Sequence, residues 1–162
     1  MITFETALAE LGPVRTQPLF VMQVGVERSH ALGAPGGADQ RVGDMVAGRF
    51  AGERLAGAVL PGGSDWQTIR ADGTVLLDAR VVLRTDDGAA IGMTYEGIRT
   101  GPADVLASLA RGEPVDPQAY YFRTTARFTT SAAQYDWLNR VIAIGIGYRL
   151  PTGPLYSLHE IL

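Results

Sequence analysis

Asp65 and Trp66 place a carboxylate next to a large aromatic surface, directly after the glycine-rich stretch Leu60-Pro-Gly-Gly-Ser64. Two glycines let the backbone turn where a Cβ would clash, so this stretch predicts a tight turn that leads into a strand. Apolar neighbours raise the pKa of a carboxylate toward the range of a general base, whereas an approaching arginine lowers it. Asp65 is therefore the candidate catalytic base, and the alternative is that it only caps the turn through backbone hydrogen bonds.

Arg80 is the candidate catalytic partner of Asp65, because a guanidinium group can stabilise an enolate or oxyanion. All 14 basic residues of the chain are arginine, which suits planar, bidentate recognition of a carboxylate or enolate. Side chains alternate across a strand, so Asp78, Arg80 and Arg84 share one face of a predicted strand over residues 74–84. Two interpretations of that face stay open: it lines a polar lumen, or it faces solvent.

Aromatic and polar side chains elsewhere in the chain could hold a ligand. The two tryptophans could stack an aromatic or polycyclic molecule, and core packing explains them equally well. Asn139 is either a polar pocket group or a turn cap. The candidate substrate-binding residues are Trp66, Asp78, Tyr121, Arg123, Trp137 and Asn139.

The residue types that are absent exclude several chemistries. The chain has no cysteine and no lysine, which excludes thiolate nucleophiles, cysteine-ligated zinc, Schiff bases and the lysine of a phosphate-binding loop. His30 and His159 are the only histidines and lack the spacing of a metal site, so we expect neither a metal nor a cofactor. The arginines are scattered and the formal net charge is -3, which argues against a nucleic-acid partner.

The N-terminus and the hydropathy pattern indicate a soluble protein. Residues 1–12 contain two glutamates and no basic stretch, so they do not resemble a secretory signal. No apolar run reaches the length of about 18 residues that a membrane-spanning helix needs. We expect a cytoplasmic protein without a membrane partner, folded as a single domain over residues 1–162.

Strands are the elements that must position these side chains. Asp72-Gly73 and Asp87-Gly88 lie between alternating apolar residues and predict two hairpins. Residues 31–37 form a predicted loop, either a lid at a barrel mouth or a surface connection. Strands are predicted over residues 19–26, 54–60, 66–70, 74–84, 89–99, 120–129, 138–148 and 155–161, and one short helix over 100–112. About eight or nine strands at regular spacing predict an all-β fold, an antiparallel up-and-down β-barrel or a closed sandwich.

Four motifs in order resemble a known family. They are Gly57-Ala-Val-Leu-Pro-Gly-Gly-Ser-Asp-Trp66, Asp78-Ala-Arg80 leading to Leu83-Arg-Thr-Asp-Asp-Gly88, Tyr121-Phe-Arg123, and Tyr135-Asp-Trp-Leu-Asn139. Together they resemble the domain of unknown function 3237 family, the UPF0311 proteins. The resemblance implies an all-β barrel grouped by shape with allene oxide cyclases and dirigent proteins. It implies no activity, because a shared fold does not transfer a function.

These side chains fit more than one class of function. A carboxylate, arginines, a tyrosine and aromatic walls suit proton transfer by a cofactor-independent isomerase, cyclase or lyase that acts on an aromatic or acidic metabolite. The same parts suit a non-catalytic carrier or sensor of such a small molecule. A third possibility is a structural module whose apolar strand faces form a homo-oligomer, which we expect in any of the three cases.

Overall fold

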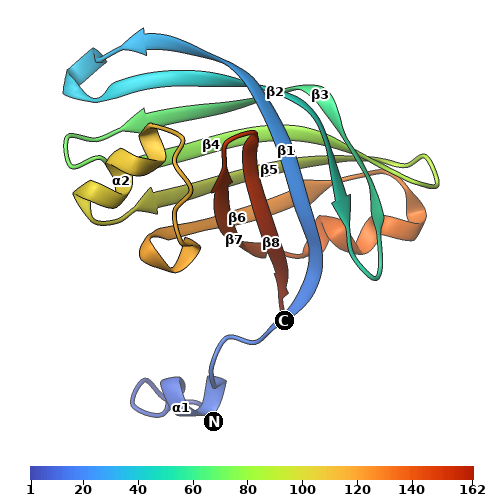
Figure 1. Ribbon diagram of the computed structural model, residues 1–162. Helices are drawn as coiled ribbons and strands as arrows, with labels where there is room; N and C mark the ends of the chain where they lie inside the picture. Colours follow the sequence, from blue (N-terminus) through green and yellow to red (C-terminus); the bar gives the residue numbers. More distant parts are fainter.

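The computed structural model describes all 162 residues and shows one closed barrel of eight antiparallel strands. Each strand pairs with the next one along the chain, and β8 pairs with β1 to close the barrel (Figure 1). The strands are β1 (Thr16–Gly33), β2 (Asp39–Ala51), β3 (Ala56–Ile69), β4 (Val75–Thr85), β5 (Ala90–Thr100), β6 (Tyr121–Thr129), β7 (Ala143–Leu150) and β8 (Gly153–Ile161). The predicted all-β, up-and-down barrel is confirmed.

Both predicted Asp-Gly hairpins are present, and they join β3 to β4 and β4 to β5. Gly73 and Gly88 have φ angles of 83° and 93°, in the left-handed region that favours glycine. The Asp72 carboxylate accepts a hydrogen bond from the backbone N–H of Thr74 at 2.9 Å. This local chemistry fixes the meander that carries Asp65 on its first strand.

The region between residues 31 and 60 contains more strand than the sequence predicts. β2 was not predicted, because its glycines are typical of irregular chain. A Cβ at Gly48 would lie 2.2 Å from the carbonyl oxygen of Gln23 on β1, so glycine here permits a close approach of two strands. The predicted loop over residues 31–37 is shorter than expected, since β1 extends to Gly33 and a 3-10 helix, η1 (Pro35–Gly37), forms the hairpin tip.

The stretch from Leu60 to Ser64 is a bulge inside β3 and does not separate two strands. Leu60 and Ser64 both pair with β4, and the three residues between them oppose a single residue of that strand. Gly62 supplies the left-handed conformation that the bulge needs, with φ at 101°. The two short strands predicted on either side are therefore one strand that bends around the barrel.

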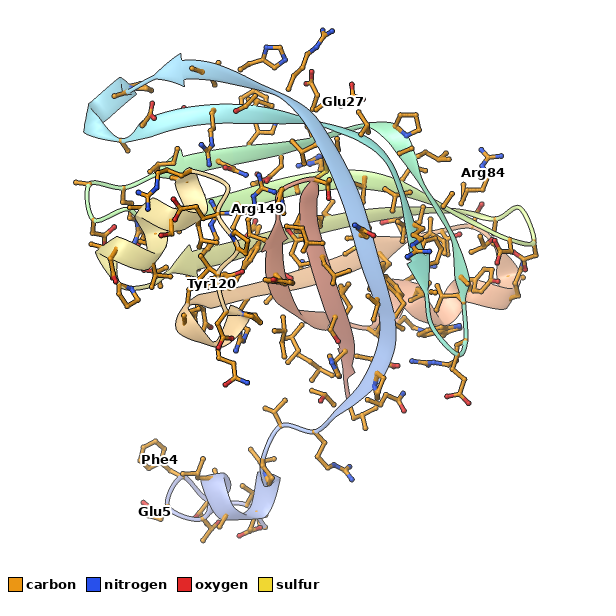
Figure 2. All side chains as sticks on the ribbon, in the orientation of Figure 1. Phe4, Glu5, Glu27, Arg84, Tyr120 and Arg149 are labelled. Carbon is orange, nitrogen blue, oxygen red and sulfur yellow. The ribbon has the colours of Figure 1, made fainter.

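Helices contribute little to the fold. They are α1 (Ala7–Leu11), α2 (Ala103–Ala110) and the 3-10 helices η2 (Pro117–Ala119) and η3 (Ala133–Arg140). α2 confirms the one predicted helix and covers one end of the barrel (Figure 1). α1 lies apart from the barrel, on the N-terminal segment that carries Phe4 (Figure 2). Because η3 occupies the start of the predicted strand over residues 138–148, β7 begins only at Ala143.

The barrel interior is apolar at one end and polar at the other. Every second residue of β4 from Val75 to Thr85 is buried, which is the period expected of a strand with one face inside a barrel. The ring centroid of Phe20 lies 5.3 Å from that of Phe50 and 6.1 Å from that of Phe128. Such rings fill the end near the β2–β3 and β4–β5 turns. The opposite end, near α2, holds charged side chains.

Candidate functional site

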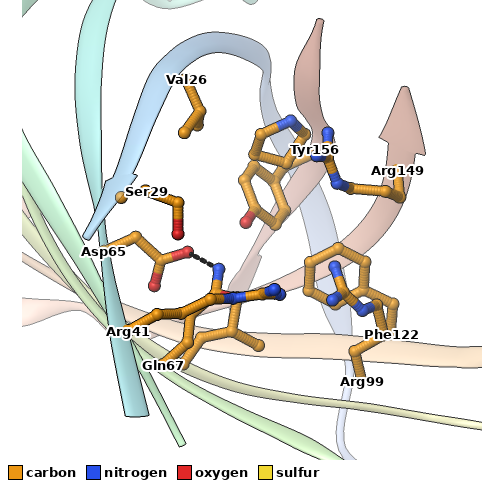
Figure 3. A pocket seen from close by; sticks show the side chains of 12 residues that line it. Val26, Ser29, Arg41, Asp65, Gln67, Arg99, Phe122, Arg149 and Tyr156 are labelled. Atoms are coloured by element: carbon orange, nitrogen blue, oxygen red, sulfur yellow. Dashed lines mark hydrogen bonds between the residues drawn. The ribbon is translucent and has the colours of Figure 1, made fainter. Parts of the chain in front are cut away.

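A small polar cavity lies inside the barrel at the end near α2. Its volume is about 130 Å³, and all eight strands contribute to its lining. The polar side chains that line it are Ser29, Arg41, Asp65, Gln67, Arg99, Arg149 and Tyr156 (Figure 3). A site enclosed by every strand is part of the lumen and not a hollow between surface loops.

Asp65 is the one acidic side chain in this cavity. It is 3% exposed, and its Oδ2 accepts a hydrogen bond from Gln67 Nε2 (Figure 3). Its Oδ1 is buried and has no hydrogen-bond partner. Burial raises the pKa of the carboxyl, and the Gln67 hydrogen bond and the charges of Arg99 and Arg41 oppose that rise. Asp65 is therefore held in place at one oxygen, with its other oxygen free to take a proton.

Gln67 connects Asp65 to the first of three arginines. It lies two residues after Asp65 on β3, so both side chains point into the lumen. Its Oε1 accepts a hydrogen bond from Arg41 Nε at 2.8 Å, while its amide nitrogen donates to Asp65. An amide that donates to one neighbour and accepts from the other has a fixed orientation. Gln67 thereby positions the carboxylate.

The cavity contains more positive than negative charge. Arg41, Arg99 and Arg149 all line it, and none of them belongs to the four ion pairs of the protein. Arg99 is only 8% exposed, and its guanidinium carbon lies 5.6 Å from the ring centroid of Phe122. Burial, together with the charges of Arg149 and Arg41, lowers the pKa of Arg99. Three guanidinium groups beside one carboxylate form an electropositive site.

Tyr156 lines the site, and Tyr95 packs against the Tyr156 ring. The ring centroids of Tyr95 and Tyr156 lie 5.3 Å apart, and both side chains are at most 2% exposed. Burial raises the pKa of each hydroxyl, so both stay protonated at neutral pH and can act as hydrogen-bond donors. The hydroxyl of Tyr156 has no hydrogen-bond partner in the protein. Unpartnered buried polar atoms are rare in native proteins, and two occur in this one cluster.

Glycines on the inward face of β7 give the lumen its shape here. Gly145 and Gly147 alternate with outward-facing isoleucines, so no side chain of this part of β7 enters the lumen. A Cβ at Gly147 would lie 2.5 Å from Cδ1 of Phe122. The missing side chain lets the Phe122 ring approach the backbone of β7 closely.

Comparison with known proteins gives the relationship of the chain. A family model described as a protein of unknown function (DUF3237) matches residues 14–161. The chain belongs to the DUF3237 family. A UPF0311 protein of Clostridium acetobutylicum is 42% identical over 117 residues, which are 72% of this chain and 74% of that protein. These findings confirm the resemblance carried by the four motifs.

Solved structures share the barrel of this DUF3237 protein. A conserved protein of unknown function from Rhodopseudomonas palustris is 34% identical, with a TM-score of 0.88 over 93% of this chain and 99% of that one. An enzyme from Penicillium herquei is 24% identical, with a TM-score of 0.71 over 93% of this chain and 96% of that one. At that identity the second likeness concerns the fold alone.

Neither α1 nor α2 of the DUF3237 chain has the length and apolar character to cross a bilayer.

Of the residues predicted to form a site, only Asp65 lies in the lumen. Trp66 follows it on β3 and is therefore turned outward, with 55% of its surface exposed. Asp78 and Arg80 lie on the exposed face of β4, where Asp78 is the cross-strand partner of Trp66. Arg84 shares that face and points away from the barrel (Figure 2). The charged face of β4 thus faces solvent, and the expected meeting of Arg80 with Asp65 does not occur.

Tyr121 and Arg123 are also on the outside of the barrel. Both are exposed positions of β6, and the Arg123 guanidinium carbon lies 5.0 Å from the Tyr121 ring centroid. They line an open groove of about 590 Å³ together with apolar side chains such as Ile98 and Ile144. The structure brings this pair together, but on the opposite side of the barrel wall from Asp65.

Homo-oligomer formation and a cytoplasmic location stay predictions.

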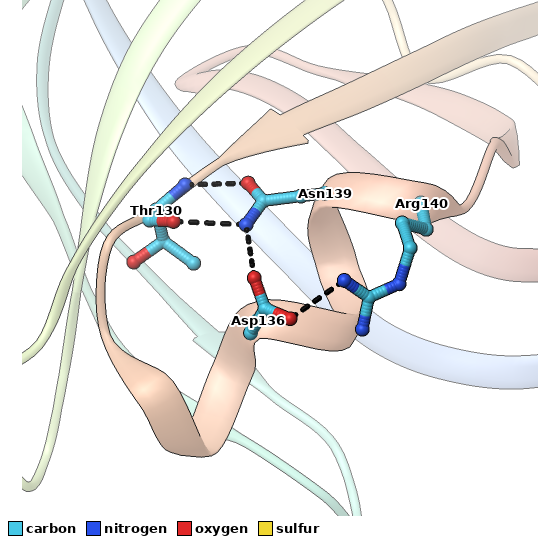
Figure 4. Close-up of polar contacts among 4 residues, drawn as sticks. All are labelled: Thr130, Asp136, Asn139 and Arg140. Atoms are coloured by element: carbon cyan, nitrogen blue, oxygen red, sulfur yellow. Dashed lines mark hydrogen bonds and ion pairs between the residues drawn. The ribbon is translucent and has the colours of Figure 1, made fainter.

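Trp137 and Asn139 belong to η3, at the end of the barrel opposite Asp65. Trp137 is half-buried and packs against the core, with the Arg54 guanidinium carbon 4.1 Å from its ring centroid. Asn139 accepts a hydrogen bond from the backbone N–H of Thr130 at 2.8 Å and donates to the backbone carbonyl of Thr130 at 2.9 Å (Figure 4). The contacts of Trp137 are those of a residue that packs against the core, and the contacts of Asn139 are those of a turn cap.

Six polar residues of the lumenal cluster were not predicted: Ser29, Arg41, Gln67, Arg99, Arg149 and Tyr156. The sequence does contain a signal for Arg99. Ile91, Met93 and Tyr95 alternate along the buried face of β5, and Arg99 continues the same phase. A single arginine on an otherwise apolar strand face must enter the lumen and requires a polar environment there. A row of several charges, as on β4, instead indicates a solvent-facing surface.

Neither histidine lies in the lumen. No cluster of three or more histidine, aspartate or glutamate side chains could hold a metal ion. His30 is exposed and its Nε2 lies 2.9 Å from Asp44 Oδ2. His159 Nε2 lies 3.0 Å from Ser157 Oγ. The ionisable groups that the lumen itself offers to a ligand are a carboxylate, guanidinium groups and phenolic hydroxyls.

Proposed function

We propose that this DUF3237 protein binds a small anionic molecule in the barrel lumen and transfers a proton on it through Asp65. One observation carries the proposal: a buried carboxyl with a raised pKa lies beside three guanidinium groups that have no ion-pair partner. The reaction class is a cofactor-independent isomerisation, cyclisation or elimination.

The excess of positive charge supports an anionic ligand. A buried charge without a partner is unfavourable, and Arg99 is 8% exposed with Arg41 and Arg149 near it. A ligand carboxylate, phenolate or enolate would compensate these charges through charge-assisted hydrogen bonds. Arginine is suited to this role because its planar fork contacts two oxygens at once.

Asp65 supports proton transfer to and from such a ligand. In the proposed step, Asp65 takes a proton from a carbon next to a carbonyl group, and the C–H electron pair moves into the carbonyl to give an enolate. A guanidinium group stabilises the enolate oxygen. The protonated Asp65 then gives a proton, either the abstracted one or one exchanged with solvent, to a carbon of the conjugated system, which restores the carboxylate. Protonation at another carbon gives an isomer. A carboxyl with a raised pKa is better matched to this work near neutral pH than an exposed one.

A non-catalytic carrier or sensor is the second candidate function. The observation that favours it is the enclosure of Asp65, whose partnerless oxygen is buried. A carrier would use the arginines in the same way and leave the ligand unchanged. The two candidates therefore differ in the fate of the ligand and agree on where it binds.

Deuterium exchange into a probe acid separates the two candidates. Phenylpyruvate, an aromatic acid with an exchangeable C–H next to its carbonyl, is incubated with the protein in D2O, and deuterium uptake is followed by NMR. We expect Asp65→Asn to slow catalysed exchange by a factor of about 100 or more while binding is kept. Glu53→Gln, an exposed change at the opposite end of the barrel, is the matched control.

Binding of the same probe is measured by calorimetry. Arg99→Met is expected to weaken binding about tenfold or more, since a hydrogen bond to a charged group contributes about 1.5–3 kcal/mol. Exchange that proceeds equally in wild type and Asp65→Asn would refute catalysis by Asp65. Binding without any exchange would identify a carrier, and binding indifferent to Arg99→Met would refute the lumenal anion site.

A further inference from the structure

We propose that the lumenal cavity is only the inner half of the binding site, and that the ligand is an elongated acid whose apolar body lies beneath α2. The acidic group of this ligand contacts the three arginines, and the few atoms that react lie beyond them, toward Asp65. This inference rests on the proposed function, because it extends the same anion site to a class of ligand.

The volume of the inner cavity sets the first limit. It is about 130 Å³. A dry cavity of about 150 Å³ holds a molecule the size of benzene. Ligand pockets for larger metabolites usually have about 300–1,000 Å³. The inner cavity therefore has room for one ring or a short chain, and the rest of a larger ligand must lie elsewhere.

A second cavity lies next to the first on the side of α2. Its volume is about 550 Å³, and Arg41, Arg99 and Arg149 line it as they line the inner cavity. The same three arginines therefore border both spaces. We call this second cavity the vestibule.

The vestibule is lined by more hydrophobic residues than the inner cavity, and charged side chains such as Asp39 and Asp72 also line it. Eight of its 14 lining residues are hydrophobic, against four of 12 in the inner cavity. α2 contributes Leu106 and Leu109, and the ends of β3 and β4 contribute Ile69 and Val75. Leu106 packs against the β3–β4 turn, where a Cβ at Gly73 would lie 3.0 Å from its Cδ1. The vestibule thus offers apolar walls on one side of the three arginines, and the inner cavity offers polar groups on their other side.

This order of surfaces selects the orientation of a ligand. An apolar body gains free energy by burial against Leu106 and Ile69, and it gains nothing next to Asp65 and Gln67. A carboxylate or phenolate gains most at the arginines between the two spaces. A hydrophobic carboxylic acid or a phenol larger than one ring fits both demands, whereas a compact dicarboxylate would leave the vestibule unused.

A pair of probe acids with the same charge tests this arrangement. Benzoate and biphenyl-4-carboxylate differ by one ring. With the carboxylate at the arginines, the first ring lies next to them and the second ring extends further into the vestibule. Calorimetry on the full chain should show that biphenyl-4-carboxylate binds about tenfold or more tightly than benzoate, because burial of a further ring removes apolar surface from water.

Two tryptophan variants locate the second ring. Ala110 is an exposed vestibule residue on α2, so Ala110→Trp fills the vestibule without disturbing the core. It should weaken biphenyl-4-carboxylate at least tenfold and change benzoate by less than about threefold, a difference in free energy of more than about 0.7 kcal/mol between the two probes. Ala133→Trp makes the same change on η3, at the far end of the barrel, and should leave both affinities unchanged.

The outcomes separate the ligand class from the proposed function. If benzoate binds and biphenyl-4-carboxylate binds equally or more weakly, the vestibule is not part of the site, while the lumenal anion site stands. If Ala110→Trp weakens both probes alike, the two-part division is also overturned. If neither probe binds, or if Arg99→Met does not weaken benzoate, the anion site itself fails and the present inference fails with it.

Discussion

Asp65→Asn is expected to stabilise the folded protein at neutral pH. The Asp65 side chain is 3% exposed, one of its oxygens has no partner, and burial raises its pKa above the value of 3.8 that it has when unfolded. An acid whose pKa is raised by folding binds its proton more tightly in the folded state. At neutral pH the ionised carboxylate therefore reduces stability, by about 1.4 kcal/mol for each unit by which the pKa is raised.

The size of the effect follows from burial and from the neighbours that remain. Leaving one buried acceptor unpaired costs about 1–3 kcal/mol, and the charges of Arg99 and Arg41 offset part of that cost. Asparagine has the same shape and can still accept the hydrogen bond from Gln67. We therefore expect a gain of about 1–2 kcal/mol, which for a chain of this length is a rise in melting temperature of about 2–8 °C.

The pH dependence provides the assay. As the pH falls from the raised folded-state pKa toward 3.8, the wild-type carboxyl becomes protonated in the folded protein and the destabilisation disappears. Urea unfolding at pH 7 and near pH 4 should therefore show an advantage of Asp65→Asn that is largest at pH 7 and shrinks on acidification. Glu53→Gln, which removes an exposed carboxylate, should show no such trend. An Asp65→Asn protein that is less stable than wild type at pH 7 would refute the argument.

Four further substitutions test other contacts of the barrel by urea unfolding. Arg54→Ala removes the ion-pair partner of the buried Glu160 and should cost about 1–3 kcal/mol; no loss would mean that the pair is dispensable. Gly147→Ala places a Cβ 2.5 Å from the Phe122 ring and should cost about 1–3 kcal/mol through overpacking. Gly112→Ala is the control for backbone strain, because Gly112 has a φ of 76° and open space around it. Asn139→Ala removes two hydrogen bonds to backbone and should cost about 1–2 kcal/mol without changing affinity for benzoate; weaker benzoate binding would reopen its role as a pocket residue.

Turn chemistry predicted the meander of the barrel, and glycine composition misled for the strands before it. Asp72-Gly73 and Asp87-Gly88 fix their hairpins locally, so their positions follow from four residues each. Gly48 has a different role, since it lets two strands approach where any Cβ would meet a carbonyl oxygen. That requirement comes from the neighbouring strand and is invisible in the local sequence. β2 could therefore be recognised only once its partner was in place.

The location of the site was predictable only in part, for a similar reason. Asp65 was predicted from its turn and its neighbours, and its burial agrees with the raised pKa expected of a base. Arg80 and Arg123 share strand faces with other polar residues, and these faces prove to be solvent-facing. The lumenal arginines come from strands far apart in the sequence, and the closure of the barrel brings them together. Barrel closure is a property of all eight strands and leaves no trace in any single motif.

The same barrel contains two buried groups of charges with opposite expected responses to neutralisation. At one end, Glu160 is hydrogen-bonded to Gln17 and paired with Arg54, so loss of the arginine leaves a buried charge without its partner and destabilises the fold. At the other end, Asp65 lacks a partner at one oxygen and Arg99 lacks an ion pair, so removal of either charge relieves a desolvation cost that is already present. Stabilisation by Asp65→Asn and Arg99→Met together with loss of exchange and anion binding would mean that the fold tolerates these charges for the sake of a ligand. Destabilisation by both would instead assign them to the architecture of the barrel.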